Sequence, residues 1–336
     1  MKITVIGGGS WGLGLSKVLD DNGHTVLVYN HTQDIVDAIN HKHYSPHLDV
    51  AIPASIEATS NLKEAIKASR VIVFAVPTKV IREVITNALP YFNEKKTIVN
   101  AAKGIEPKTF LRVSEIFEEM VPKKHLDAFV TLSGPSHAEE VIRAQTTAVT
   151  AASNDFTAAV RVQKLFHNSM YFRVYSSDDV KGVELGGSLK NIFALASGII
   201  RGIGLGDNAL AAFMTRSMVE MEKIYHHLGA DTRTLYGLSG VGDLIVTCTS
   251  KHSRNFQAGY KIGSGSDLEA TLESMTMVVE GIRTTEAAHQ LSEDAGLDTP
   301  IIDAIYNVVF NTMQPSAVIS ELLNRDFKAE NTSKMV

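Results

Sequence analysis

Apolar and polar residues follow two different rhythms along the first half of the chain. Short runs rich in Val, Ile, Leu and Phe, such as residues 71–76, favour strands that are buried on both faces. Between them lie segments with apolar residues every three or four positions, which is typical of amphipathic helices. The predicted strands are Lys2–Ile6, Thr25–Tyr29, Ser69–Val76, Thr97–Ala101, Ala128–Ser133, Thr147–Ala152 and Tyr171–Tyr175. The predicted helices are Ser10–Asp21, Asp34–Ile39, Leu62–Ala68, Thr78–Leu89, Phe110–Met120 and Asp155–Phe166. This alternation predicts a parallel, doubly wound α/β sheet.

The pattern changes after about residue 178, where β-branched runs thin out and helical periodicity takes over. The helices predicted there are Val180–Ile200, Asn208–Leu228, Ser266–Met275, Val279–Ala295 and Ala304–Phe310. We therefore predict a Rossmann-like α/β domain over residues 1–179, an all-α domain over residues 180–327 and a loose polar tail over residues 328–336. A cleft between two such domains is a common place for a small-molecule site.

Composition narrows the possible functions. The chain has 336 residues, of which 44% are hydrophobic, and a net charge of −5 without a block of Lys and Arg, so we expect no nucleic-acid partner. The single cysteine, Cys248, excludes an intrachain disulfide and a cysteine-based zinc site, and the histidines lack metal-binding spacing. We predict a cytoplasmic protein without a bound metal or a membrane span, because the longest apolar stretch, residues 192–200, is short.

The first predicted strand runs directly into a glycine-rich turn and then into a predicted helix. Gly7, Gly9 and Gly12 fit the spacing G-x-G-x-x-G. In a dinucleotide-binding unit the first glycine permits the tight turn, the second lets the backbone approach the pyrophosphate, and the third lets the helix pack on the strand. The N-terminus of the helix then faces the anion. This order predicts a dinucleotide site, and the alternative is a glycine-rich turn without a ligand.

The end of the second predicted strand bears on the choice of cofactor. An acidic residue there favours NAD, because it accepts hydrogen bonds from the adenosine ribose. Here Val28-Tyr29 leads into Asn30-His31-Thr32, which contains no acid. His31 is placed to contact a 2′-phosphate, so we expect NADP(H), with NAD(H) as the alternative. His31 is equally explained as a solvated residue at the start of a helix.

Two polar segments follow predicted strands of the first domain. Lys103 comes just after the strand at 97–101, and ligands bind at the carboxyl ends of parallel strands. Gly134 and Ser136 follow the strand at 128–133, where a hydroxyl and backbone N–H groups suit an anion or a nicotinamide. Each segment alone is also compatible with a solvated loop or a capped turn.

The second domain contributes a lysine within an apolar helix. Lys190 and Asn191 interrupt a predicted helix that is otherwise rich in Leu, Ile, Phe, Ala and Gly. Such a lysine either extends along the helix to solvent or is desolvated, which lowers its pKa and suits it to proton transfer. Farther along, residues 237–247 are expected to form a glycine-rich turn that delivers Asp243 and Thr247.

Together these residues describe hydride transfer to a carbonyl. Lys190 is the candidate general acid for carbonyl reduction and general base for alcohol oxidation. Lys103 would raise the positive potential beside Lys190, and Asp243 and Thr247 would orient Lys190 and the substrate hydroxyls. The triplet Ser253-Arg254-Asn255 suits a phosphate group, although a solvated loop explains it equally well.

The order of the motifs resembles the bacterial soluble NAD(P)-dependent glycerol-3-phosphate dehydrogenase family over residues 2–327. The motifs are Gly7-Gly8-Gly9-Ser10-Trp11-Gly12, Ala101-Ala102-Lys103-Gly104, Ser133-Gly134-Pro135-Ser136, Ser188-Leu189-Lys190-Asn191, Gly240-Val241-Gly242-Asp243-Leu244 and Ser253-Arg254-Asn255. The resemblance implies reversible hydride transfer between NAD(P)H and dihydroxyacetone phosphate, which yields sn-glycerol 3-phosphate for phospholipid synthesis.

The resemblance also implies specific contacts. Cofactor contacts fall on Ser10, Trp11, His31, Lys103, Ala138, Arg254, Val278 and Glu280, in addition to the loop glycines. Substrate contacts fall on Lys103, Gly134, Ser136, Lys190, Asp243, Ser253, Arg254 and Asn255, to which we add Asn191 and Thr247 as neighbours of Lys190 and Asp243. The implied proton acceptor is Lys190.

Two departures from the family pattern and several alternatives stay open. The family often has Arg where His31 stands, and a Tyr-Leu-Pro-Gly loop where this chain has Tyr44-Ser45-Pro46-His47. The alternative enzymes are β-hydroxyacid and 6-phosphogluconate-type dehydrogenases, which need a clamp for a carboxylate. A non-catalytic NADPH sensor could dispense with Lys103, Lys190 and Asp243. The predicted helix 208–228 is either core or the face of a homodimer.

Overall fold

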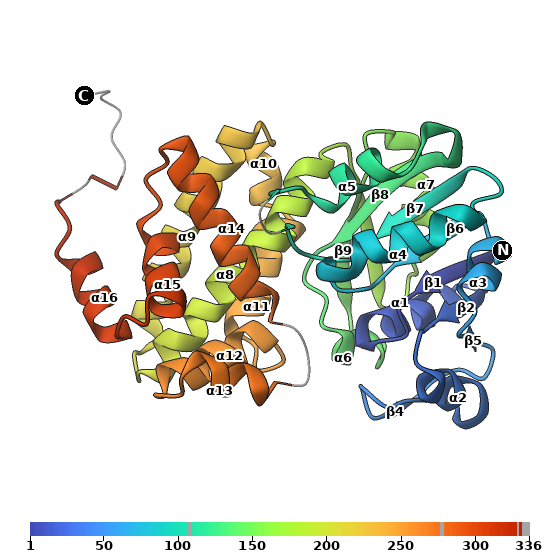
Figure 1. The fold of residues 1–336 in the computed structure, drawn as a ribbon, viewed down its shortest axis with the longest axis horizontal. Coiled ribbons are helices and arrows are strands. Elements are labelled where there is room, and N and C mark those ends of the chain that lie inside the picture. The colour runs from blue at the N-terminus through green and yellow to red at the C-terminus, as the bar shows by residue number, and fades with distance from the viewer. Residues whose placement is uncertain (107–108, 276–278, 328, 331–336) are drawn as a thin grey trace.

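The computed structural model describes residues 1–106, 109–275, 279–327 and 329–330, and Figure 1 shows an α/β body beside a helical body. An eight-stranded sheet with the order β10-β9-β8-β7-β6-β1-β2-β5 forms the first body. Its strands are β1 (Lys2–Ile6), β2 (Thr25–Tyr29), β5 (Glu57–Thr59), β6 (Val71–Phe74), β7 (Lys96–Asn100), β8 (Leu126–Ser133), β9 (Thr147–Ala152) and β10 (Phe172–Ser177). The order from β5 to β8 is the 3-2-1-4-5-6 order of a Rossmann fold, so the predicted fold class is confirmed.

The sheet departs from parallel pairing at one pair of strands, and the sequence pattern did not predict this pair. β8 and β9 are antiparallel, whereas all other pairs in this sheet are parallel. The connection between them carries only the four-residue helix α6 (Ala138–Val141), not a crossover helix that spans the sheet. The sequence pattern also missed β5, whose Glu-Ala-Thr sequence at the sheet edge has no apolar run, and the small hairpin of β3 (Tyr44–Ser45) and β4 (Val50–Ala51).

Helices cover both faces of the sheet because its strands are apolar on both sides. Ile3 and Val5 of β1 pack in a core with α1 (Ser10–Asp21), α2 (Gln33–Lys42) and α7 (Phe156–Phe166). Ile6 of the same strand packs in a second core with α3 (Leu62–Ala68), α4 (Ile81–Ala88) and α5 (Val113–Met120). Short 3-10 turns occur at Thr78–Val80, Leu89–Tyr91 and Lys123–His125. Pairing of Ile6 with Tyr29 and Phe74 brings the carboxyl ends of three strands together at the glycine-rich turn.

The helical body is built around α8 (Val180–Gly202), which is buried over most of its length. Around it lie α9 (Asp207–Leu228), α10 (Thr232–Leu235), a π-helical turn (Leu238–Gly242), α11 (Asp243–Thr249), α12 (Arg254–Gly263), α13 (Leu268–Glu273), α14 (Glu280–Ala295), α15 (Pro300–Phe310) and α16 (Pro315–Leu323). A Cβ atom on Gly198 would lie 2.1 Å from the carbonyl oxygen of Phe256, and one on Gly259 would lie 1.8 Å from that of Leu195. Glycines therefore let α12 pack against the backbone of α8.

One segment that we predicted as a glycine-rich turn is helical, and so is another for which a solvated loop was one of two interpretations. Residues 237–247 form the π-helical turn and α11, and Ser253-Arg254-Asn255 opens α12. Gly240 explains the first error, because a Cβ atom there would lie 2.0 Å from the carbonyl oxygen of Leu235. This glycine serves close packing inside a helix, whereas the sequence pattern suggested a turn. Helices α10 and α16 were not predicted.

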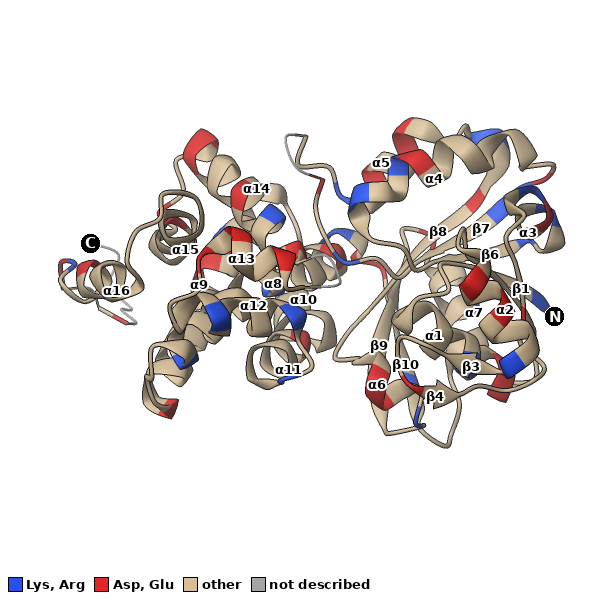
Figure 2. Cartoon of the chain, turned by 60° about the horizontal axis from the view of Figure 1, so that its bottom comes forward, with Lys and Arg blue, Asp and Glu red and all other residues tan. Residues whose placement is uncertain are grey.

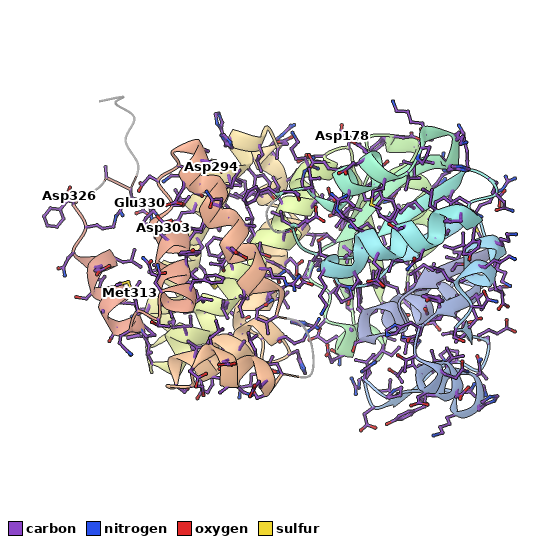
Figure 3. All side chains as sticks on the ribbon, in the orientation of Figure 1. Asp178, Asp294, Asp303, Met313, Asp326 and Glu330 are labelled. Atoms are coloured by element: carbon purple, nitrogen blue, oxygen red, sulfur yellow. The ribbon has the colours of Figure 1, made fainter. Side chains whose placement is uncertain are left out.

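The two bodies meet where β10 ends and α8 begins, and Asp178 marks this junction in Figure 3. By length and composition α8 alone among the described helices could cross a membrane, but its apolar window is wholly buried inside the protein. Basic and acidic residues are interspersed over both bodies (Figure 2). Asp326 and Glu330 lie beyond α16 (Figure 3), and most of the predicted tail, residues 328 and 331–336, lies outside the described residues.

Candidate active site

The glycine-rich turn has the geometry that a bound pyrophosphate requires. Gly7 has a φ of +116°, and a Cβ atom on it would lie 2.6 Å from the carbonyl oxygen of Ala75. A Cβ atom on Gly12 would lie 1.8 Å from the carbonyl oxygen of Gly7, so only glycine lets α1 pack here. Gly9 instead faces open space just before Ser10, the first residue of α1. The turn therefore leaves free room at a helix N-terminus, and its residues fit a dinucleotide cofactor.

Other predicted cofactor residues lie on both sides of this turn. His31 is exposed just after β2, and the neighbouring Asn30 lies 3.0 Å from where a Cβ atom of Gly8 would be. Trp11, in the first turn of α1, packs against the core, and its buried Nε1 has no hydrogen-bond partner among the described residues. Ala138 begins α6, which packs against α1. His31 forms no hydrogen bond or ion pair with any described residue of the site.

The carboxylate of Asp243 joins the two predicted catalytic lysines. Lys103 Nζ donates to Asp243 Oδ2 at 2.7 Å and to the carbonyl oxygen of Gly134 at 2.9 Å. Lys190 Nζ donates to Asp243 Oδ1 and, at 2.9 Å, to Thr247 Oγ1. Because Asp243 and Thr247 lie one turn apart on α11, both face α8. The structure thus brings together one lysine from each body and an acid between them.

Lys190 is buried, so it does not extend along α8 to solvent, which was the alternative prediction. Burial lowers its pKa to about 7; the charge of Asp243 opposes this fall, and the charge of Lys103 adds to it. A lysine with a pKa near neutrality can both give and take a proton at physiological pH.

The segment after β8 lies beside the lysine pair. Gly134 has a φ of +151°, and a Cβ atom on it would lie 2.9 Å from Val149 Cα, so this position requires glycine. Its carbonyl oxygen accepts from Lys103 Nζ and, at 2.9 Å, from Ser136 Oγ. Ser136 is thereby held at the edge of the same site.

The three residues predicted to hold a phosphate differ in whether their side chains already form hydrogen bonds within the protein. Ser253 Oγ accepts from the backbone N–H of Phe256 and caps the N-terminus of α12. Asn255 donates to Asn191 Oδ1 at 2.9 Å and accepts from the backbone N–H of Gly281 at 2.8 Å, so its side chain cross-links three helices. Arg254 is exposed and forms no hydrogen bond or ion pair with another described residue.

Glu280, the first residue of α14, lies close to the loop that carries Lys103. A Cβ atom on Gly104 would lie 2.6 Å from Thr78 Oγ1 and 3.3 Å from Glu280 Oε2. Burial raises the pKa of Glu280, and the charges of Arg283 and Arg254 oppose this rise. Glu280 and Arg254 therefore share one electrostatic environment. Val278, the other predicted contact here, lies outside the described residues.

Two residues of this region, His137 and Thr78, were not predicted from the sequence. His137, which precedes α6, is half-buried and lies 3.4 Å from the carbonyl oxygen of Val246 in α11, so it bridges the two bodies. Burial lowers its pKa, and the charge of Lys190 adds to this effect. Thr78 is buried, and its hydroxyl has no hydrogen-bond partner among the described residues. A chemical signal was present for His137, because this histidine directly follows the Ser133-Gly134-Pro135-Ser136 motif.

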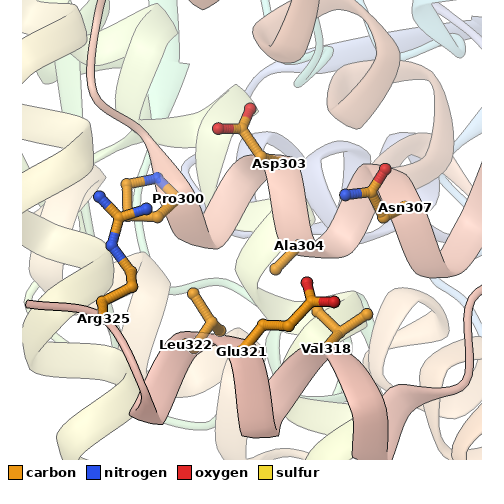
Figure 4. Close-up of a pocket in the computed structure, with 8 residues that line it drawn as sticks. All are labelled: Pro300, Asp303, Ala304, Asn307, Val318, Glu321, Leu322 and Arg325. Atoms are coloured by element: carbon orange, nitrogen blue, oxygen red, sulfur yellow. The ribbon is translucent and has the colours of Figure 1, made fainter.

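A separate cavity of about 150 Å³ lies between α15 and α16 (Figure 4). It is lined by Pro300, Asp303, Ala304, Asn307, Val318, Glu321, Leu322 and Arg325. None of the predicted site residues lines it, and we assign no part of the chemistry to it.

A Rossmann sheet with an open glycine turn, facing a helical body that supplies a buried lysine, defines a nicotinamide-dependent oxidoreductase. Two family models match the chain. "NAD-dependent glycerol-3-phosphate dehydrogenase N-terminus" covers residues 2–159, and "NAD-dependent glycerol-3-phosphate dehydrogenase C-terminus" covers residues 179–320. The chain therefore belongs to the NAD-dependent glycerol-3-phosphate dehydrogenase family, as the motifs predicted.

Individual relatives agree with this assignment. The glycerol-3-phosphate dehydrogenase [NAD(P)+] of Bacillus thuringiensis (strain Al Hakam) is 49% identical over 333 residues, which cover 98% of this chain and 97% of the relative. The crystal structure of glycerol-3-phosphate dehydrogenase from Coxiella burnetii matches with a TM-score of 0.89 and 33% identity, over 96% of this chain and 99% of that one. A ketopantoate reductase from Ralstonia eutropha has a TM-score of 0.61 at 13% identity over 96% of this chain and 100% of that one, and it shares the fold alone.

Proposed function

We propose that the chain catalyses the reversible reduction of dihydroxyacetone phosphate to sn-glycerol 3-phosphate with NAD(P)H. The observation that carries this proposal is the pair of lysines held by Asp243, with the N-terminus of α12 and the free Arg254 on the same body. The product supplies the glycerol backbone of phospholipids, and we propose that the enzyme acts in the cytoplasm.

In the proposed reaction Lys190 Nζ gives a proton to the carbonyl oxygen of the substrate, and it takes that proton back in the direction of oxidation. When bound, NAD(P)H supplies the hydride. Lys103 stabilises the negative charge that develops on the same oxygen. Asp243 holds the two ammonium groups side by side, and Thr247 fixes the direction of Lys190. Thus Lys190 transfers the proton, and the other residues orient Lys190 or stabilise the charge that develops.

The phosphate of the substrate binds, we propose, at the start of α12. Arg254 offers paired charged donors in the first turn of α12, and the N-terminus of this helix favours an anion. Ser253 contributes by capping this helix, and Asn255 by tying its start to Asn191 and Gly281. This is a revision of the predicted role of Asn255, whose side chain already uses its hydrogen bonds within the protein.

The test is the loss of absorbance of the reduced nicotinamide, with purified protein and dihydroxyacetone phosphate, using NADPH and NADH in parallel. We expect rapid loss of this absorbance. The loss should be faster with NADPH than with NADH, because the residues that follow β2, among them His31, are not acidic. A folded protein that binds the cofactor yet reduces only hydroxyacid-type ketones would move the proposal to the related dehydrogenases. Binding without turnover of any ketone would support the sensor alternative.

Arg254→Ala is expected chiefly to raise the Michaelis constant for dihydroxyacetone phosphate, by about tenfold or more, because a charged hydrogen bond contributes roughly 1.5–3 kcal/mol. Steady-state kinetics at saturating cofactor measures this effect. Lys261→Ala is a matched control, because Lys261 lies in the last turn of the same helix and donates to Ser274. If Arg254→Ala changed only the affinity for cofactor, the phosphate would lie elsewhere.

A homodimer is also part of the proposal. Met221 of α9 lies in the helical core, and Met214 and Met218 pack against it, so the methionines of α9 face inward at least in part. These methionines therefore do not identify a dimer face. A measurement of the mass in solution tests whether the chain forms a dimer.

A further inference from the structure

A buried carboxylate on α8 contacts the α/β body. Glu184 is 6% exposed, and its Oε1 accepts from the backbone N–H of Ser114 at 2.9 Å. Its Oε2 accepts from Ser114 Oγ and, at 3.1 Å, from Arg112 Nη1. Arg112 and Ser114 begin α5, so a side chain of the helical body holds the first turn of a helix of the other body.

The chain between β7 and α5 carries Lys103, and backbone contacts join its residues 105 and 106 to residues 111 and 112. Ile105 is buried in the core of the helical body, and it forms an antiparallel bridge with Arg112. The backbone N–H of Glu106 also donates to the carbonyl oxygen of Leu111 at 3.0 Å. The described residues of this loop therefore move with Arg112, whose side chain Glu184 holds.

The same side of α8 continues to the catalytic lysine. Gly187 lies three residues after Glu184, which places the two residues on one face of the helix. A Cβ atom on Gly187 would lie 3.6 Å from Lys103 Cγ, so the side chain of Lys103 runs directly over it. Lys190 follows three residues later and meets Lys103 through Asp243.

We propose that Glu184 is a positioning residue, which holds the described residues 103–106 and 109–112 against α8 so that Lys103 reaches Asp243 beside Lys190. This inference rests on the proposed function, because it concerns the same pair of lysines. Glu184 does not touch the substrate; it sets the distance between the lysine of one body and the lysine of the other.

The surroundings of Glu184 suit a fixed carboxylate. Burial raises its pKa, and the hydrogen bonds from Ser114 and the charge of Arg112 oppose the rise, while Glu115 adds to it. A carboxylate at a helix N-terminus is further stabilised by the helix dipole. Arg112 is shared with Glu115, to which its Nη2 donates at 2.6 Å, so the whole first turn of α5 forms one network.

Glu184→Gln keeps the shape of the side chain but removes its charge and one acceptor. We expect the turnover number to fall about tenfold to a hundredfold, since a displacement of about 1 Å can cost a hundredfold, while the Michaelis constant for the cofactor stays unchanged. The apparent pKa of Lys190 in the pH profile should rise. The positive charge of Lys103 would lie farther from Lys190, while the negative charge of Asp243 would stay beside it. Two further titratable groups among the described residues feel the charge of Lys190, namely His137, whose pKa is lowered, and Cys248, whose pKa is raised by burial.

The chain offers a matched control. Glu220 of α9 is also buried and also accepts from the first N–H groups of a helix, those of Ile301 and Ile302 in α15, but it lies within the helical body. Glu220→Gln should cost comparable thermal stability and leave the pH profile in place. A shift of the profile in both variants would mean a general loosening of the fold, and it would overturn the proposal.

Ser114→Ala is the second variant, in case Glu184→Gln does not fold. It removes one donor to Glu184 and keeps the backbone N–H, so a smaller shift in the same direction is expected. An unchanged pH profile in folded Glu184→Gln or, failing that, in Ser114→Ala would overturn the positioning role. Absence of dihydroxyacetone phosphate reduction by the unmodified protein would instead contradict the proposed function, which keeps the two failures distinguishable.

Discussion

Lys190→Ala is expected to lower the turnover number for dihydroxyacetone phosphate by about a hundredfold to ten-thousandfold, the range for loss of a general acid or base. The ammonium of Lys190 is buried, is held by Asp243 and Thr247, and has a pKa of about 7. Reduction needs its protonated form, so the rate of the unmodified enzyme should decline as pH rises through about 7. Oxidation needs the neutral form and should show the opposite trend.

Two measurements separate this chemical role from loss of structure. Cofactor binding, followed by the fluorescence of the reduced nicotinamide, should be kept in Lys190→Ala. Lys181→Ala is the control on the same helix, because Lys181 donates to the carbonyl oxygen of Leu228 and lies away from the site. An unimpaired Lys190→Ala enzyme would remove Lys190 from the mechanism, and equal losses in both variants would point to α8 as a whole.

The sequence predicted best those parts of the site that depend on local structure. The glycine turn could be located because close backbone packing requires glycine there. Gly12 packs against the backbone of Gly7, and Gly7 packs against Ala75 at the end of the neighbouring strand. The direction of β9 could not be found, because an apolar run looks the same in parallel and antiparallel pairs. The helical state of residues 254–263 was hidden because Ser253 and its polar neighbours are equally typical of a loop.

For residues that form contacts between the two bodies or between distant helices, the sequence did not reveal the contact partners. Glu184 stands in the predicted helix that carries Lys190, but its partners Arg112 and Ser114 are about 70 residues away and carry no motif. Asn255 was predicted to contact the substrate, yet its side chain serves Asn191 and Gly281. Charge and residue type reveal which side chains can do chemistry, whereas the partner of each depends on how the helices pack.

Asp243→Asn is expected to have the second largest effect, and it acts on stability and activity together. Asp243 is 1% exposed, and each of its carboxylate oxygens accepts from a different lysine. Removing one partner of a buried ion pair costs about 3–5 kcal/mol of unfolding free energy, because the remaining charge is left uncompensated. At pH 6, where Lys190 is still largely protonated before folding, two ammonium groups would face an amide, so we expect the upper part of that range there and a turnover number reduced by about a hundredfold or more.

The pH dependence of this loss has a defined sign. The pKa of Lys190 is already lowered from 10.5 to about 7 in the folded protein, and without Asp243, whose charge opposes that fall, it should fall further. Between the folded and unfolded pKa values the unfolded chain binds more protons, so the free energy of unfolding rises with pH in this window. The window extends below pH 7 in Asp243→Asn, so the variant should be rescued in part by raising the pH from 6 to 9.

Urea unfolding of both proteins at pH 6 and pH 9 measures this rescue, and Asp207→Asn supplies the control. Asp207 pairs with Arg201 at the surface, where its side chain is 91% exposed, so its loss should change neither stability nor activity appreciably. A variant at Asp243 that is equally destabilised at both pH values would show that its lysines keep their charge by other contacts. In that case the lowered pKa of Lys190 could not depend on the balance between Asp243 and Lys103, and the assignment of Lys190 as a neutral-pH acid would lose its physical basis.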